Sequence, residues 1–323
     1  MGVAWGVLST ARINRSVLEG ARESELADVV AVASRDQARA EAYAREHGIP
    51  VAHGSYEALL EDRAVEAVYI PLPNSLHVEW SIRALEAGKH VLCEKPLAAR
   101  AEDAERAFAA AESAGLLLSE AFMYRHHPQT RRLSELVAEG AVGEPRVVRA
   151  SFSFRLDDPT NVRMLRELDG GSLMDVGCYC VSGARLVAGA EPERAFGEAV
   201  DPAGVDVRFS GSLRFPGPLL ASFHCGFDIR SGHELEVVGS EGSLFLADPW
   251  HCRESGIELR REDAVEQISV ERANSYRLEL DDMSDAIRSG RAPLLGRDDA
   301  VGQARALEAL RHSAEQGSPV AVG

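Results

Sequence analysis

The first third of the chain alternates short apolar segments with helical ones, and this alternation constrains the fold more than any other feature of the sequence. Helices are expected between the apolar segments, and Gly48 is a typical residue for ending one of them. Strands and helices in alternation predict a parallel, doubly wound α/β sheet. The apolar runs predict its strands at residues 3–8, 28–34, 65–70, 90–93 and 116–119.

The pattern changes after about residue 122, which marks the expected domain boundary. From residue 195 to about 270 the chain is a run of strands separated by turn signals such as Pro216-Gly217. Helical patterns precede this run and close the chain after it. Such an order predicts an α+β domain with a large, mostly antiparallel open sheet. The expected domains are therefore residues 1–122 and 123–323.

Charge and composition narrow the class of partner and the compartment. The net charge of −16, from 35 basic and 51 acidic residues, argues against nucleic acid or an anionic membrane as partner. No apolar run approaches the roughly 20 residues that span a bilayer, and no basic leader precedes the first strand. The five cysteines lack metal-site spacing and predict buried, reduced thiols. We therefore expect a cytoplasmic protein that has no metal and acts on a small molecule.

The loop after the first strand lies where a dinucleotide-binding turn belongs. In place of the glycines of G-x-G-x-x-G it has Ser9, Ala11 and Asn14. A pyrophosphate can still be held there by the amides and dipole of a helix N-terminus, with hydroxyl groups of Ser9 and Thr10 as further donors. An ordinary turn between a strand and a helix accounts for the same residues equally well.

The end of the second strand bears on the choice of cofactor. NAD enzymes usually have an acidic residue there that binds the ribose 2′-hydroxyl. This chain has Ser34 followed by Arg35, a neutral donor and a cation, which suit a 2′-phosphate, and Arg12 and Arg39 can assist. If a cofactor binds, these residues favour NADP over NAD, whereas a solvated turn is the alternative. Asp36 is interpreted as the cap of the next helix.

The run Cys93-Glu94-Lys95-Pro96 ends the strand predicted at residues 90–93. The chain has only two lysines, Lys89 and Lys95, and its other basic residues counted with them are arginines. Arginine stays charged, whereas lysine is a compact donor whose pKa shifts readily on burial. Lys95 is therefore a candidate functional amine, and a surface lysine without a role is the alternative.

A second group of candidate residues follows the glycine pair Gly170-Gly171. Asp175 and Tyr179 are four positions apart, so they share one face of a helix, and Gly177 between them permits close approach. A phenol can exchange a proton while a carboxylate one turn away orients it or the substrate. The alternative is a helix that buries Tyr179 among apolar residues and pairs Asp175 with a surface arginine.

Taken together, Cys93-Glu94-Lys95-Pro96 and Asp175-x-Gly-x-Tyr179 resemble motifs of the Gfo/Idh/MocA oxidoreductases, and the resemblance covers essentially the whole chain. The opening loop and the tyrosine motif resemble the sugar 1-dehydrogenase and dihydrodiol dehydrogenase branch. Many relatives carry histidine at Tyr179 and glycines at Ser9 and Ala11. Supporting motifs are Pro73-Asn74-x-x-His77, Glu120-Ala121-Phe122-Met123-Tyr124-Arg125 and Asn161-x-Arg163.

The resemblance implies a Rossmann-like first domain that binds NADP, with NAD possible, and a mechanism. Lys95 would hydrogen-bond the reacting hydroxyl, Tyr179 would be the general acid and base, and Asp175 would orient the substrate. Asn161 and Arg163 would line the sugar pocket, and Pro96 would follow a cis peptide bond. The expected cofactor contacts are Ser9, Thr10, Ala11, Arg12, Ile13, Ser34, Arg35, Arg39, Pro71, Asn74, His77, Glu94, Lys95 and Arg125.

His77 has two interpretations: it lines the nicotinamide end of the site, or it satisfies a hydrogen bond on a half-buried helix. For the protein as a whole, the leading hypothesis is an NADP-dependent dehydrogenase or reductase of a cyclic polyol, most simply an aldopyranose oxidised at C1. A dihydrodiol dehydrogenase or anhydro-sugar ketone reductase is the second hypothesis, and a non-catalytic sugar or nucleotide sensor is the third. The set of Lys95, Asp175 and Tyr179 argues against a sensor. A homodimer or homotetramer through the C-terminal sheet is expected.

Overall fold

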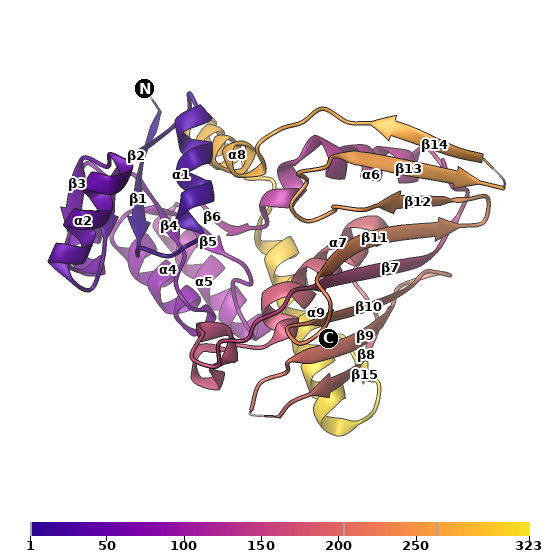
Figure 1. The fold of residues 1–323 in the computed structure, drawn as a ribbon. Helices are drawn as coiled ribbons and strands as arrows, with labels where there is room; N and C mark the ends of the chain where they lie inside the picture. The colour runs from indigo at the N-terminus through magenta and orange to yellow at the C-terminus, as the bar shows by residue number, and fades with distance from the viewer. Residues whose placement is uncertain (1, 203, 263) are drawn as a thin grey trace. The chain divides into compact units, whose positions relative to one another are not determined.

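The computed structural model describes residues 2–202, 204–262 and 264–323 (Figure 1). The described chain forms two compact units. The first contains residues up to 98 together with residues 102–126 and 274–301, and the second contains the remainder. The chain therefore passes from the first unit to the second near residue 126, and residues 274–301 belong to the first unit again.

The first unit is built on a six-stranded parallel sheet with the order β3-β2-β1-β4-β5-β6. This order is that of a doubly wound dinucleotide-binding sheet, so the predicted fold of this half is confirmed. The three-residue strand β3 was not predicted. The strands are β1 (Val3–Leu8), β2 (Ala27–Ala33), β3 (Val51–His53), β4 (Ala67–Ile70), β5 (His90–Glu94) and β6 (Leu118–Ala121).

Helices pack against this sheet, and two of them have the bounds that the sequence indicated. Gly48 ends α2 in the left-handed conformation at φ +72°, as expected for a glycine that closes a helix. The helices are α1 (Asn14–Glu23), α2 (Gln37–His47), α3 (Tyr56–Glu61), α4 (His77–Glu86), α5 (Ala101–Ala114) and α8 (Ser275–Ser289), with short 3₁₀ turns η1 (Asn74–Leu76) and η2 (Met123–His126).

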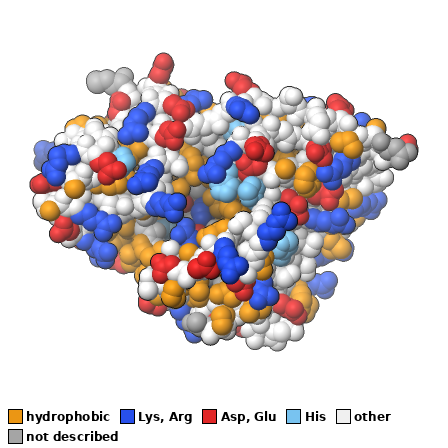
Figure 2. Space-filling view, in the orientation of Figure 1, with side chains coloured by type: hydrophobic (Ala, Val, Ile, Leu, Met, Phe, Trp, Pro, Cys, Tyr) orange, Lys and Arg blue, Asp and Glu red, His pale blue; other side chains and the backbone are white. Residues whose placement is uncertain are grey.

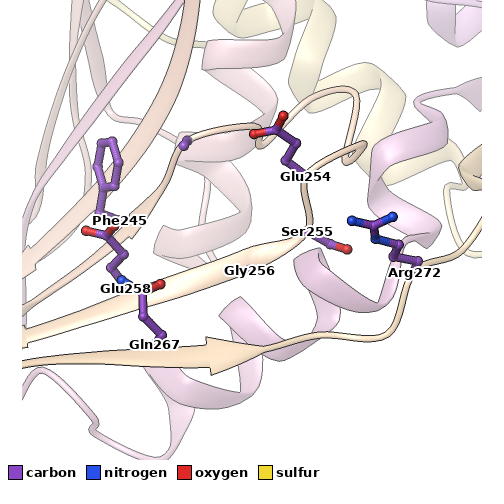
Figure 3. A pocket seen from close by; sticks show the side chains of 8 residues that line it. Phe245, Glu254, Ser255, Gly256, Glu258, Gln267 and Arg272 are labelled. Carbon is purple, nitrogen blue, oxygen red and sulfur yellow. The ribbon is translucent and has the colours of Figure 1, made fainter.

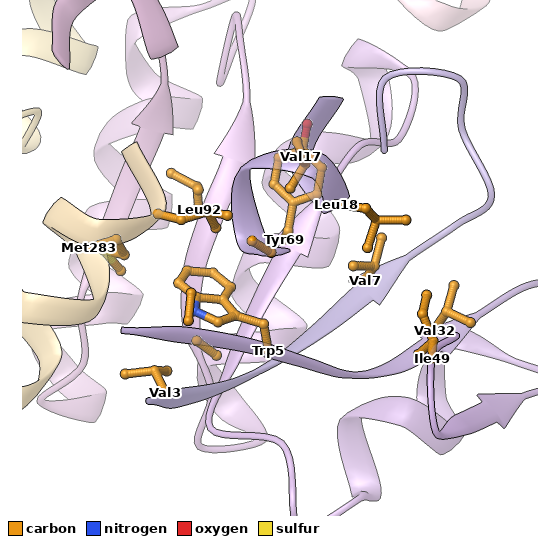
Figure 4. Close-up of a cluster of buried hydrophobic side chains, with 14 of the residues drawn as sticks. Val3, Trp5, Val7, Val17, Leu18, Val32, Ile49, Tyr69, Leu92 and Met283 are labelled. Carbon is orange, nitrogen blue, oxygen red and sulfur yellow. The ribbon is translucent and has the colours of Figure 1, made fainter. Parts of the chain in front are cut away.

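Helix α8 belongs to the first unit although the sequence placed it in the second domain. Its Leu280 and Met283 are buried in the same apolar cluster as Trp5 of β1 (Figure 4). The indole Nε1 of Trp5 also donates to Ser284 Oγ at 3.1 Å. Burial of the apolar face of α8 thus joins it to β1 across a long stretch of sequence, on the other side of the domain boundary predicted at residue 122.

The second unit contains a nine-stranded sheet with the order β14-β13-β12-β11-β7-β10-β9-β8-β15. The β7–β10 ladder is parallel and the other described ladders are antiparallel, which confirms the predicted mostly antiparallel sheet. The strands are β7 (Pro145–Ser153), β8 (Arg194–Val200), β9 (Arg208–Arg214), β10 (Leu220–Gly226), β11 (Gly232–Gly239), β12 (Ser243–Leu246), β13 (Gly256–Arg261), β14 (Ala264–Ser269) and β15 (Val320–Ala321).

The helices of the second unit are α6 (Pro128–Ala138), α7 (Cys178–Ala188) and most of α9 (Arg297–Gln316). Shorter turns are η3 (Val162–Met164) and η4 (Arg166–Leu168), and the π-helical segment η5 (Leu173–Gly177) leads into α7. Strand β9 alternates strictly between exposed and buried residues, so one face of the sheet packs on the core and the other is open.

The surface and the thiols agree with several expectations from composition. Acidic and basic side chains are interspersed over the face shown in Figure 2. All five cysteines are buried and none is in a disulfide. Within the described ranges, no helix is both long enough and apolar enough to cross a membrane.

Candidate active site

The loop between β1 and α1 adopts a glycine-like turn without a glycine. Ser9 has φ +122°, a region that favours glycine. Its backbone carbonyl accepts from Asn14 Nδ2 at 2.8 Å, and its Oγ accepts from the amide of Ala11 at 3.2 Å. The same hydroxyl donates to the carbonyl of Pro71 at 3.3 Å, after β4. Hydrogen bonds thus hold Ser9 in the conformation that a dinucleotide-binding turn requires, and the small side chains suit a diphosphate.

Two cations follow β2, Arg35 just after the strand and Arg39 in the first turn of α2. Ser34 is buried, whereas Arg35 and Arg39 are exposed. Burial raises the pKa of Tyr56, and the two guanidinium groups oppose that shift, so both act on the same phenol. Throughout residues 2–202, 204–262 and 264–323, neither arginine forms an ion pair with a carboxylate. Two such cations beside a strand end can bind an anion.

Asp36 caps helix α2, as predicted, because its Oδ1 accepts from the amide of Arg39 at 2.7 Å. The sequence also predicts that Asn74 caps the helix after Pro73. Asn74 instead begins the 3₁₀ turn η1, and α4 starts three residues later without a side-chain cap at Leu76.

His77 at the start of α4 is tied to the main chain on both sides of its ring. Nδ1 lies 2.8 Å from the carbonyl oxygen of Pro96, and Nε2 lies 2.7 Å from that of Leu72. The side chain is 1% exposed, and burial lowers its pKa to about 4 although the two carbonyls oppose the shift. This geometry favours the second interpretation of His77, in which it holds the loops after β4 and β5 together.

The two lysines lie at opposite ends of β5. Lys89, just before the strand, donates from Nζ to the carbonyls of Asp62 and Val65, both at 2.7 Å. Lys95 follows the carboxyl end of the strand, where it is half-buried and precedes a cis peptide bond to Pro96. That cis bond agrees with what the resemblance implied.

Acidic residues surround the end of β5. The carboxylate of Glu94 accepts a short hydrogen bond from Tyr69 Oη, and burial together with this carboxylate raises the pKa of Tyr69 well above its usual value. Glu120 accepts from the amide of Leu97 at 2.7 Å and so holds the segment after Pro96. Arg125 pairs with Asp299 at 3.2 Å within the same unit. Its guanidinium is therefore already engaged with an acid of α9.

In the second unit, the glycine pair permits a tight junction before η5. A Cβ on Gly170 would clash with the carbonyl oxygen of Arg163, and one on Gly171 would clash with Asp206. Gly171 also has φ +114°, which disfavours other residues. A Cβ on Gly177 would lie 2.8 Å from Cys225 Sγ of β10. Gly177 therefore allows the sheet to approach, whereas the sequence left open whether a ligand did so.

Arg163 and Asp175, two predicted substrate residues, lie in contact. Arg163 Nε donates to Asp175 Oδ2 at 2.6 Å. The Asp175 side chain is 14% exposed and that of Arg163 is 42% exposed. Asn161 accepts from the amide of Arg163 at 3.1 Å and thereby begins the turn η3. Asp175 is thus paired with a surface arginine, as the alternative interpretation of the sequence expected. That arginine is Arg163, which was itself expected to line the sugar pocket.

Tyr179 is the second residue of α7, which follows directly on the π-helical segment. Its ring is 7% exposed and packs edge-on against Phe152 with centroids 5.3 Å apart, and it lies 5.9 Å from the ring of Trp250. The wider turn of η5 keeps Asp175, four residues earlier, on nearly the same side. π-Helical segments occur frequently at functional sites.

Asp206 is a site residue that sequence reasoning missed. It accepts from Ser172 Oγ at 2.6 Å and from the amide of Leu173 at 2.8 Å, so it caps the segment that carries Asp175. Burial raises its pKa to about 6, although these hydrogen bonds favour the ionised form. In the sequence, the segment that begins at Ser172 lacks a local capping residue. Nothing in the sequence indicates that the distant Asp206 would cap it.

A cavity of about 390 Å³ in the second unit is separate from these residues (Figure 3). It lies along β12, β13 and β14 and contains neither Asp175 nor Tyr179. Its lining is formed by Phe245, Ala247, Glu254, Ser255, Gly256, Glu258, Gln267 and Arg272. The predicted substrate residues therefore define the candidate site better than this cavity does.

The strand order of the first unit is that of the doubly wound sheets that bind dinucleotides. The chain matches the description "Oxidoreductase family, NAD-binding Rossmann fold" over residues 4–122 and "GFO/IDH/MocA C-terminal domain" over residues 130–245. It belongs to the Gfo/Idh/MocA family of oxidoreductases. The predicted family and enzyme class are thereby confirmed.

Relatives of known activity cover most of the chain. The D-xylose 1-dehydrogenase (NADP⁺) 2 of Haloferax volcanii is 42% identical over 98% of both chains. The trans-1,2-dihydrobenzene-1,2-diol dehydrogenase of Oryctolagus cuniculus is 40% identical, over 73% of this chain and 72% of its own. The crystal structure of KijD10, a 3-ketoreductase from Actinomadura kijaniata in complex with NADP and TDP-benzene, has a TM-score of 0.91 and 34% identity over 97% of this chain and 98% of its own.

Proposed function

We propose that this protein is an NADP-dependent dehydrogenase that oxidises an aldopyranose at C1, or reduces the corresponding product. The observation that carries the proposal is the position of Lys95 at the carboxyl end of β5. Doubly wound sheets bind dinucleotides beyond the carboxyl ends of their strands. An amine there would act on a substrate hydroxyl next to the cofactor.

The residues at the ends of β1 and β2 would hold NADP. The turn containing Ser9, Thr10 and Ala11 suits the diphosphate, and Ser34 with the cations of Arg35 and Arg39 suits the 2′-phosphate. Support comes from the D-xylose relative, whose name specifies NADP⁺, and from KijD10, which was crystallised with NADP. When bound, the nicotinamide accepts or provides the hydride.

The remaining expected cofactor contacts divide into direct and supporting roles. Pro71 supports the first loop through its hydrogen bond with Ser9. His77 supports the segment at Pro96 through the main chain. Glu94 is the candidate for a ribose hydroxyl. Arg12, Ile13, Asn74 and Arg125 complete the proposed cofactor set.

The chemistry of the substrate is assigned to Lys95 of the first unit and to Asp175 and Tyr179 of the second. Lys95 donates a hydrogen bond to the reacting oxygen and stabilises negative charge that develops on it. Tyr179 takes the proton during oxidation and returns it during reduction. Asp175, held by Arg163, accepts hydrogen bonds from a neighbouring hydroxyl of the sugar, and Asn161 lies on the same loop.

A second candidate activity is oxidation of an unsaturated cyclic diol. The rings of Phe152 and Trp250 pack beside Tyr179, so the surroundings of this phenol are aromatic and apolar, which suits an unsaturated ring. The rabbit relative acts on such a diol by name. Reduction of an anhydro-sugar ketone would use the same residues in reverse.

The test is a substrate panel with purified protein. D-Xylose, D-glucose and trans-1,2-dihydrobenzene-1,2-diol are each mixed with NADP⁺ or NAD⁺, and the formation of reduced cofactor is followed by absorbance. We expect turnover of an aldopyranose, with a higher kcat/KM for NADP⁺ than for NAD⁺. Tight NADP⁺ binding without turnover of any substrate would overturn the proposal in favour of a sensor.

We also infer a cytoplasmic homodimer or homotetramer that uses the open face of the second unit's sheet. Val200 and Leu220 at the ends of β8 and β10 are 46% and 45% exposed, which supports an apolar contribution to such a contact. Light scattering coupled to gel filtration measures the mass directly. A monomer at micromolar concentration would contradict this assembly.

A further inference from the structure

Two histidines and an aspartate converge in the second unit, on the other side of Phe152 from Tyr179. His233 lies on β11, and Asp248 and His251 lie in the loop between β12 and β13. His233 Nε2 is 3.3 Å from Asp248 Oδ1, and His251 Nδ1 is 3.7 Å from the same oxygen. One ligand atom from each of the three residues lies within 4.8 Å of the other two.

These separations are close to those of a metal site. Zinc bonds to histidine nitrogen and carboxylate oxygen are about 2.0–2.2 Å long, so tetrahedral ligand atoms are about 3.4 Å apart. The distances of 3.3 and 3.7 Å from Asp248 Oδ1 therefore need little adjustment to accept an ion. Both histidine side chains are about one-third exposed, at 34% and 31%, so an ion can enter from solvent.

The aspartate is held in place before any ion binds. Asp248 Oδ2 accepts from the amides of Arg253 at 2.7 Å and Glu254 at 3.3 Å, and Oδ1, which accepts from the amide of His251 at 3.2 Å, is the oxygen that faces the two imidazoles. Gln129, fully buried, donates to the carbonyl of Asp248 at 2.9 Å and accepts from the amide of Gly256 at 2.7 Å. Such outer hydrogen bonds are typical of metal-binding carboxylates.

The neighbouring aromatic residues also fix the loop. The fully buried Trp250 donates to the carbonyl of Ser151 at 2.9 Å, and Phe152 contacts the rings of both His233 and His251, at 6.1 and 5.4 Å between centroids. Phe152 is the same ring that packs on Tyr179. The cluster is therefore rigidly supported and lies one aromatic side chain from the proposed acid and base.

We propose that His233, Asp248 and His251 bind one divalent transition-metal ion per chain, with Zn²⁺ as the best match. Two imidazoles and one carboxylate favour such an ion over Mg²⁺ or Ca²⁺, which prefer oxygen ligands alone. Three protein ligands leave a coordination position open to water or another ligand. The site assigned by this geometry is separate from the nicotinamide chemistry and does not depend on it.

The test measures Zn²⁺ binding to untagged, chelator-treated protein by titration calorimetry, with the melting temperature as a second readout. Wild-type protein should bind one Zn²⁺ and melt at a higher temperature in its presence, because an ion that binds only the folded state stabilises it. Asp248→Asn and His251→Ala should each weaken binding by more than the roughly 10- to 100-fold typical of outer-sphere changes. When Co²⁺ replaces Zn²⁺, the bound ion should absorb visible light with the spectrum of a low-symmetry coordination geometry.

His224→Ala is the matched control, because His224 is exposed on β10 of the same sheet and lies outside the cluster. It should bind Zn²⁺ as the wild type does. Absence of Zn²⁺ binding by the wild type would overturn the proposal. Wild-type affinity in both ligand variants, or an equal loss in His224→Ala, would overturn it as well. Circular dichroism without metal verifies that each variant is folded.

Discussion

The two ends of strand β5 carry the chain's two lysines in different environments. Lys89, at the amino end, is 7% exposed and donates to two main-chain carbonyls. Lys95, at the carboxyl end, is half-buried beside Glu94 and stands where doubly wound sheets bind their ligands. The same side chain therefore serves to hold a loop at one end of the strand and is placed for chemistry at the other.

The difference teaches that position in the fold, rather than residue type, separates a structural lysine from a candidate catalytic one. Both residues are rare amines in an arginine-rich chain, so composition alone gives them equal weight. Lys89 is not a candidate catalytic residue, because its Nζ donates to the carbonyls of Asp62 and Val65. Mutations at the two positions should therefore change different properties.

The largest effect is expected for Lys95→Met. Loss of the donor to the reacting oxygen should lower kcat by roughly 10²- to 10⁴-fold, the range typical of proton-transfer groups. The affinity for NADP⁺, measured by fluorescence titration, should change by less than about tenfold, or 1.4 kcal/mol. Turnover at the wild-type rate would remove Lys95 from the mechanism.

Lys89→Met should show the opposite pattern. The free energy of unfolding should fall by about 1–3 kcal/mol, because two carbonyls lose their donor in a largely buried setting. Denaturant titration measures this change, and kcat of the remaining folded protein should match the wild type. A thousandfold loss of kcat without loss of stability would show that the contrast between the two lysines is wrong.

The smallest effect is expected for Arg35→Ala at the end of β2. The KM for NADP⁺ should rise by roughly tenfold, as one exposed charge contact with a phosphate is lost, while the KM for NAD⁺ stays the same. Arg45→Ala is the control, since Arg45 lies on α2 and pairs with Glu41. Equal increases for both cofactors would place the 2′-phosphate elsewhere.

Local signals predicted the first unit well. Both ends of α2 were indicated by single residues, because Asp36 caps it and Gly48 ends it. The strand that leads to Lys95 was evident from an apolar run that ends abruptly in charged residues. By contrast, the place of α8 in the first unit depends on the contact of Met283 with the cluster around Trp5, which no local pattern reveals.

The candidate site was predictable where its residues lie near one another in sequence. Asp175 and Tyr179 share a segment and were found from their spacing, although its π-helical form was not. Asp206 and the cluster of His233, Asp248 and His251 were missed. Their neighbours come from separate strands and loops, so only the folded sheet brings them together.

The most direct test of the central claim is a crystal structure with NADPH and the best sugar of the panel, a pair that cannot react. The account predicts that Lys95 Nζ and Tyr179 Oη both lie about 2.6–3.2 Å from the same C1 oxygen of the sugar. A complex in which either atom is farther than about 4 Å from that oxygen, with the other group or water in its place, would contradict the assignment of Lys95 and Tyr179 to one reacting hydroxyl.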